Sequence, residues 1–226
     1  MGESMREYVA IRKLVNEGKF EKAIRKAKEI KGENEKSMTF CMVAEAMIYE
    51  NRAEDAISLL NNAFEVAGKM DDELAKSLTM SKISFIMAIA GNLEDAVKMA
   101  CNIENDTEKV YALAKISHFL ASRGEVEKVE HLLSEAEKII YEMDEGIGKI
   151  LAIKTVAYTL ADMGGEDKAL ALLKHAESIA GELNEENASA AFTLIAPVMM
   201  EMGKIDDALK LSMKIKERYD LSLIHI

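Results

Sequence analysis

The chain has 226 residues and a formal net charge of −11, from 40 acidic and 29 basic side chains. This acidic excess argues against a phosphate-binding surface, so we expect no nucleic-acid partner. Hydrophobic residues make up 49% and charged residues 31%, which excludes a disordered chain, and a single proline favours an all-helical fold.

The composition also bears on the compartment. The first residues lack the apolar core of a signal peptide, and no apolar run approaches the roughly 18 residues that span a bilayer. Cys41 and Cys101 lie in apolar runs without CxxC spacing, so we expect both to be buried free thiols. We therefore predict a cytoplasmic protein that does not contact a membrane.

One short pattern recurs along the chain: a turn residue, two variable residues, an acidic residue, a variable residue and alanine. Valine replaces the alanine once. The six copies begin at Gly18, Asn51, Gly91, Gly124, Gly164 and Gly203. Such periods indicate helical repeats. We place the repeats at about 5–33, 34–70, 71–106, 107–143, 144–183 and 184–220.

The residues before each turn predict a first helix. Positions −11, −8, −7 and −4, counted back from the turn residue, are apolar or small in nearly every copy, which is one face of a helix. In the third copy they are Met80, Ile83, Ser84 and Met87. Position −7 is small in five copies, so two helix backbones can approach closely there.

The turn and the second helix follow from local chemistry. Glycine readily adopts the left-handed conformation that ends a helix, and Asn51 is the next most tolerant residue type. After the turn, positions +5, +9 and +12 are apolar or small. In the three longer copies we expect the next first helix to be capped by Asp71, Asp144 and Asn184.

Two features near the end of the chain break this pattern. Pro197 falls inside a predicted first helix, where it should remove one backbone hydrogen bond and kink the helix. Residues 221–226 match a translated transposon end sequence used in sequencing adapters. We therefore expect a non-native tail, with the natural chain continuing past Asp220.

No residue cluster indicates catalysis or a cofactor. Gly146-Ile147-Gly148-Lys149 lacks the other residues of a phosphate-binding loop, with Met143 and Ile150 in their places. The histidines show no metal-ligand spacing, and the acidic pairs are adjacent in sequence, so they do not converge on one helix face. We therefore predict a non-enzymatic protein that binds neither cofactor nor metal.

The turn sequences Gly18-Lys19-Phe20-Glu21-Lys22-Ala23 and Gly91-Asn92-Leu93-Glu94-Asp95-Ala96 resemble those of tetratricopeptide repeats (TPRs). The resemblance covers about residues 5–220. It implies a single repeat domain, an all-α α-solenoid with a right-handed superhelix of about six antiparallel helix-turn-helix repeats. The usual proline that closes each repeat is missing, and copies of 39–40 residues exceed the family's 34.

The resemblance also implies where a partner binds. First helices line the concave surface in this family, and its recognition positions correspond here to −13, −10, −6, −3 and −2. Four of the six tyrosines fall on these positions, although these aromatic side chains could instead fill space between helices. The candidate partner-binding residues are Tyr8, Arg12, Tyr49, Phe85, Tyr111, His118, Lys154 and Tyr158.

We therefore expect a scaffold that binds a peptide or helix of a partner protein, with basic character favoured by the net charge. One alternative is the repeat portion of a larger signalling regulator or enzyme that is truncated at its C-terminus. Another is a weak self-association, in which an exposed apolar terminal pair stacks end to end.

Overall fold

The computed structural model describes residues 3–224, and the side chains of residues 6–214. Within these residues the chain forms twelve α-helices and no strands. The helices form two compact units, divided between Ala112 and Leu113, and this division falls inside one helix. The predicted single domain and the predicted superhelical hand both stay predictions.

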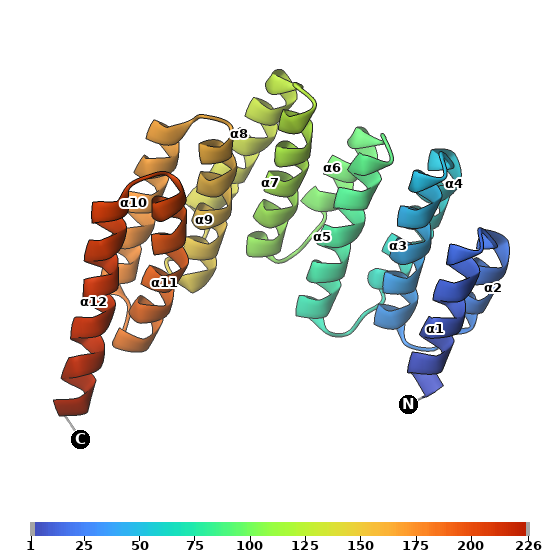
Figure 1. Cartoon of the computed structure of the whole chain (residues 1–226), viewed down its shortest axis with the longest axis horizontal. Coiled ribbons are helices and arrows are strands. Elements are labelled where there is room, and N and C mark those ends of the chain that lie inside the picture. Colours follow the sequence, from blue (N-terminus) through green and yellow to red (C-terminus); the bar gives the residue numbers. More distant parts are fainter. Residues whose placement is uncertain (1–2, 225–226) are drawn as a thin grey trace. The chain divides into compact units, whose positions relative to one another are not determined.

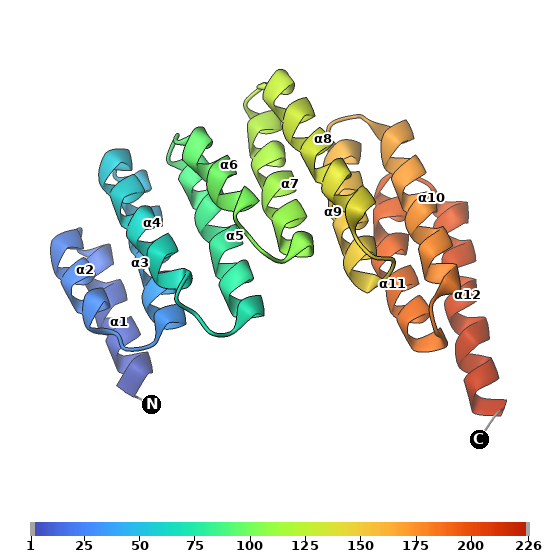
Figure 2. The same cartoon turned by 180° about the vertical axis from the view of Figure 1, so that it is seen from behind.

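The first unit contains three complete helix pairs. Their bounds are α1 (Glu3–Asn16), α2 (Phe20–Glu29), α3 (Glu33–Tyr49), α4 (Ala53–Ala67), α5 (Glu73–Ile89) and α6 (Leu93–Cys101), followed by the start of α7 (Asp106–Ser122). Figures 1 and 2 show α1, α3 and α5 as one layer and α2, α4 and α6 as the other. Helix α3 packs against α1 and α5 in its own layer and against α2 and α4.

The second unit repeats this arrangement. After the end of α7 it contains α8 (Val126–Glu142), α9 (Ile147–Asp162), α10 (Glu166–Glu182), α11 (Glu185–Glu201) and α12 (Ile205–Ile224). Helix α9 packs against α8, α10 and α11, and α11 packs against α12 as well. Each predicted repeat thus holds one antiparallel helix pair, and the chain is all-α and solenoid-like.

All six turn residues adopt the predicted left-handed conformation. Their φ angles lie between 59° at Asn51, which is the one non-glycine residue with positive φ in the described chain, and 94° at Gly91. In each turn the N–H after this residue bonds back across the helix end. Arg52 N donates to the Met47 carbonyl at 2.8 Å, for example. These bonds satisfy carbonyls that the helix end would leave unpaired.

The predicted apolar stripes form the core. In the third pair Met80, Ile83, Ser84 and Met87 are all buried, and the Ser84 hydroxyl donates to the Ser81 carbonyl at 2.8 Å. Position +5 is buried in all six second helices, as at Ala96, and position +9 is buried in every second helix except α12. Positions counted from the turn residue therefore identify the residues that pack between the helices.

The expected helix starts were only partly right. Asn184 caps α11, with its side chain accepting from Asn187 N at 2.9 Å. Asp71 does not cap α5; Asp72 does, accepting from two backbone N–H groups at 3.0 Å. Helix α9 starts after Gly146 rather than Asp144, because Gly146 takes an extended conformation that leads into the helix.

Three further expectations concern Cys101, Pro197 and the end of the chain. Cys101 is exposed rather than buried, because it follows the buried Met99 and Ala100 onto the outer side of α6. Helix α11 runs continuously through Pro197, whose side chain is exposed. For the suspected tail, the backbone of 221–224 is helical and residues 225–226 lie outside the described residues, so the tail stays a prediction.

Candidate functional site

Contacts between neighbouring first helices show which side of each helix is free. In the first unit, position −12 faces the preceding pair, since Thr79 Oγ1 lies 3.4 Å from Asn34 Oδ1 of α3. Position −9 faces the same way, since Lys82 Nζ lies 3.9 Å from Glu45 Oε1. The remaining side of the helix carries positions −17, −13, −10, −6 and −2. We call these positions of the first helices the first-helix face.

In the first unit this face carries several exposed apolar side chains, but on α3 it also carries Asn34 and Glu45, at positions −17 and −6, which contact α5. The predicted residues Tyr8 and Tyr49 lie on it, with 87% of Tyr49 accessible. The candidate residues included Phe85, which is half-buried, but not the exposed side chains around it on α5, although Leu78 and Ile89 lie at the predicted recognition positions −13 and −2. These are Leu74, Leu78 and Ile89. The periodicity already contained this signal, because all three continue the spacing of Phe85.

Position −10 behaves differently from the rest of the face. Cys41 and Ser81 occupy it in α3 and α5 and are buried, whereas Tyr8 occupies it in α1 and is exposed. Burial raises the pKa of the Cys41 thiol to about 12, so this sulfur is a neutral packing group at physiological pH. The small side chains at position −10 of α3 and α5 are thus not accessible to a partner.

The other predicted residues of the first unit are also accessible. Arg12 is exposed at position −6 of α1, and Tyr111 is exposed at position −13 of α7. Met38, at position −13 of α3, is a further exposed apolar side chain that lies on the face.

In the second unit the face becomes polar. His118 of α7 lies beside Asp162 of α9, with 3.3 Å between His118 Nδ1 and Asp162 Oδ2. Tyr158 is exposed one turn before Asp162, and Lys154 is half-buried one turn earlier. The structure thus places the predicted residue His118 beside Asp162, which follows the predicted Tyr158 by one turn and was not among the candidate residues.

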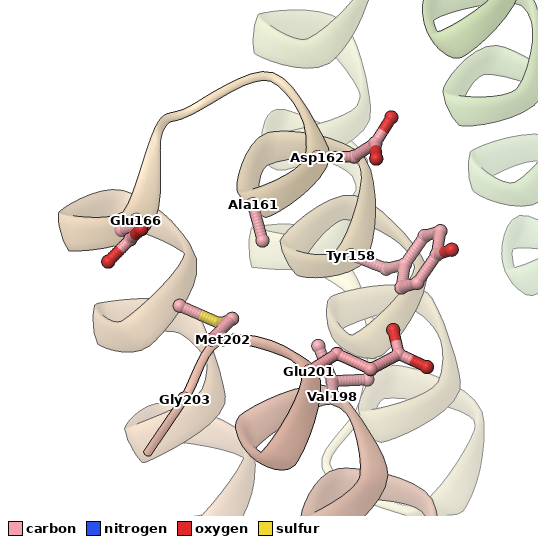
Figure 3. A pocket seen from close by; sticks show the side chains of 8 residues that line it. All are labelled: Tyr158, Ala161, Asp162, Glu166, Val198, Glu201, Met202 and Gly203. Carbon is pink, nitrogen blue, oxygen red and sulfur yellow. The ribbon is translucent and has the colours of Figure 1, made fainter.

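A pocket of about 490 Å³ opens beside Tyr158 (Figure 3). Among the lining side chains, Figure 3 shows the Tyr158 ring and the Glu201 carboxylate extending in the same direction. The lining residues are Tyr158, Ala161, Asp162, Glu166, Val198, Glu201, Met202 and Gly203. Three acidic residues and a tyrosine therefore line one opening. Lys204 Nζ lies 3.7 Å from Glu166 Oε2 at its edge.

Lys149, from the sequence that partly resembles a phosphate-binding loop, is buried and forms hydrogen bonds within the protein. Its side chain is 5% exposed, and its ammonium donates to the Met143 carbonyl and to Glu145 Oε1, both at 2.9 Å. It therefore joins the end of α8 to the start of α9. Among the described residues no three His, Cys, Asp or Glu side chains are placed to hold a metal ion.

Comparisons with known proteins address the fold. No protein-family model matches the chain, and no curated protein matches it. It is similar to the crystal structure of Ton1535 from Thermococcus onnurineus NA1, with a TM-score of 0.47 and 20% identity over 93% of this chain. The chain spans 57% of the length of Ton1535.

It is also similar to a putative kinesin light chain from Podosopora anserina with nearly identical TPR-like repeats. That comparison has a TM-score of 0.46 and 14% identity, and it covers 85% of this chain and 99% of the other. Helix pairs joined by left-handed turns, with small residues buried between them, define the class of fold here as a TPR-like helical repeat. None of the described helices is long and apolar enough to cross a membrane.

Proposed function

We propose that this protein is an interaction scaffold that binds a peptide segment or helix of a partner protein on its first-helix face. The observation that carries the proposal is the distribution of exposed apolar side chains in the first unit. Among its described residues, the large exposed apolar side chains all belong to first helices, and Val9 alone lies off the face. The face is thus the natural surface for an apolar contact.

The face offers rigid anchors of the kind that binding sites use. Tyr8 and Tyr49 combine large contact area with a hydrogen-bonding hydroxyl, and Leu74, Leu78 and Ile89 add an aliphatic strip along α5. An amphipathic partner helix matches such a strip through side chains three or four residues apart. Because these side chains project from packed helices, little backbone ordering accompanies binding.

The second unit supplies a charge preference. In the pocket beside Tyr158, Glu201 and Asp162 present carboxylates next to an aromatic ring. A lysine or arginine side chain of the partner fits this setting, because carboxylates and a ring face both attract a cation. The net charge of −11 also favours a basic partner through long-range attraction. With no disulfide between its cysteines, the scaffold suits the cytoplasm.

The test is affinity capture from a native lysate with the full chain as bait, followed by quantitation of the captured proteins. Tyr49→Ala should remove most of the specific partner, since truncating an aromatic anchor commonly weakens binding at least about tenfold. Tyr141→Ala is the matched control, because Tyr141 is 86% exposed on α8, away from the first-helix face, compared with 87% for Tyr49. Equal capture by both variants, at unchanged helicity, would refute the proposed face.

A second pair of variants tests the pocket. Glu201→Gln keeps the shape of the side chain and removes its charge, so capture should fall and should depend less steeply on salt. Glu182→Gln removes a charge from an exposed position at the end of α10, outside the pocket lining, and should leave capture unchanged. Identical salt dependence of the two variants would contradict a basic side chain in the pocket.

A further inference from the structure

The acidic residues that line the pocket beside Tyr158 differ in what they already contact. Glu166 Oε2 lies 3.7 Å from Lys204 Nζ, and Asp162 Oδ2 lies 3.3 Å from His118 Nδ1 of α7. Among the described residues, Glu201 has no ion-pair partner. The His118 and Asp162 side chains are 51% and 54% exposed, so solvent protons and a ligand can both reach this pair.

The side chains around Tyr158 show where a bound cation would lie. In Figure 3 the side chains of Asp162, Tyr158 and Glu201 extend to the right, whereas that of Glu166 lies on the left. Tyr158 and Asp162 are one turn apart on α9. Because His118 contacts Asp162, a cation that binds this carboxylate would lie within about 8 Å of the imidazole, which is roughly one Debye length at physiological salt.

Within the second unit, the titratable groups that face His118 come from α9 and from α7 itself. On α9, Asp162 pairs with it, and Tyr158 and Lys154 precede Asp162 by one and two turns. On α7, Lys115 lies one turn before His118. Helix α8 adds none, because its buried residues are all apolar. Since histidine ordinarily changes its charge between about pH 5 and 8, the charge beside Asp162 depends on pH.

We propose, on the basis of the proposed function of this pocket, that His118 makes the binding of a basic partner side chain depend on pH. When His118 is neutral, Asp162 and Glu201 both attract a cation beside Tyr158. When His118 is protonated, its imidazolium compensates the Asp162 carboxylate and repels the cation. Binding is therefore tightest at a pH where the imidazole is neutral, and it weakens as the imidazole gains its proton. The coupling is reciprocal, so a bound cation also opposes protonation of His118.

The size of the effect follows from the separation of the charges. Coulomb's law for unit charges about 8 Å apart, with an effective dielectric constant of about 40–80, corresponds to a roughly two- to sixfold change in affinity. The high dielectric constant is appropriate because both members of the pair are about half exposed. The expected pH dependence is therefore modest, and it belongs to one histidine.

The test uses a capped tripeptide with arginine between two glycines as the probe, and the same peptide with neutral citrulline as its control. Binding to the full chain is followed by the NMR shifts of the Tyr158 and Ala161 amides. From pH 7.5 to pH 5.5 the dissociation constant of the arginine peptide should rise roughly two- to sixfold. In His118→Gln, which keeps an N–H donor for Asp162 but cannot gain a charge, the ratio between the two pH values should fall to about one. His131→Gln, at an exposed position of α8 outside the pocket lining, should keep the wild-type ratio.

A direct readout of the imidazole completes the test. At pH 6.5 the arginine peptide should move the Cε1–H signal of His118 toward its position at pH 8, and it should leave that of His131 in place. Equal shifts from the arginine and citrulline peptides at pH 7.5 would overturn both the basic side chain in the pocket and its dependence on pH. Specific arginine binding with the same affinity at both pH values, or a ratio that survives in His118→Gln, would refute the role of His118 alone.

Discussion

The left-handed turns allow a prediction in which one chemical change has opposite effects at two glycines. Gly164 ends α9 with φ +82°, whereas Gly181 lies within α10 outside the left-handed region. At both positions an added Cβ would meet no atom within 4 Å. Substitution by alanine therefore tests backbone conformation alone, without a steric clash, and both sites belong to the second unit.

The magnitudes follow from the two backbones. At Gly164, the left-handed conformation costs alanine about 1–2 kcal/mol, partly offset by about 0.5–1 kcal/mol of lost freedom in the unfolded chain. Gly164→Ala should thus lower the free energy of unfolding by about 1 kcal/mol. Gly181→Ala should raise it by about 0.5–1 kcal/mol, because alanine is the better helix former.

Urea titration followed by far-UV circular dichroism measures both effects. The two variants should differ by about 1.5–2 kcal/mol, which corresponds to roughly 1 M in urea midpoint for a slope of about 1–3 kcal/mol per molar. The slope itself should stay constant, since neither change alters the buried surface. If both variants shift the midpoint in the same direction, the conformational role assigned to the turn glycines is wrong.

Four other variants or treatments probe single residues. Lys149→Met should lower the free energy of unfolding by about 1–3 kcal/mol in the same titration, because the Met143 carbonyl loses its donor. Asp72→Ala should cost about 1 kcal/mol through loss of the α5 cap. At pH 8 a maleimide should label the exposed Cys101 and leave Cys41 unmodified in the folded chain, as counted by mass spectrometry. Since burial raises the pKa of Cys41 from 9.0 to about 12, ionisation of the unfolded thiol should lower stability as pH rises from 9 towards 12.

The helix pairs and their turns could be predicted from sequence because local rules determine them. The left-handed turn at Asn51 follows from backbone sterics, and the burial of Ile83 and Met87 follows from helical spacing. The start of α5 was missed by one residue. Asp71 and Asp72 are both good N-caps, and the chain path between α4 and α5 decides which one is used.

The candidate face was harder to predict, because exposure depends on neighbouring helices. Cys41 and Ser81 occupy the same register as Tyr8, yet their small side chains are covered where Tyr8 is not. The pocket beside Tyr158 was also beyond sequence reasoning. It combines α9, the start of α10 and the end of α11, and only the tertiary arrangement brings Glu166 and Glu201 to one opening.

Pro197 has a consequence for motion. It lies within α11 on the first-helix face, and it has no N–H to donate to the carbonyl of Thr193. This turn of α11 is therefore held by one hydrogen bond fewer than its neighbours, and local opening should begin there. Amide hydrogen exchange would be fastest around this turn among the inner turns of α11. A partner bound over this turn of α11 would slow that exchange. The exchange rate of the amides around Pro197 would therefore show whether the first-helix face is occupied.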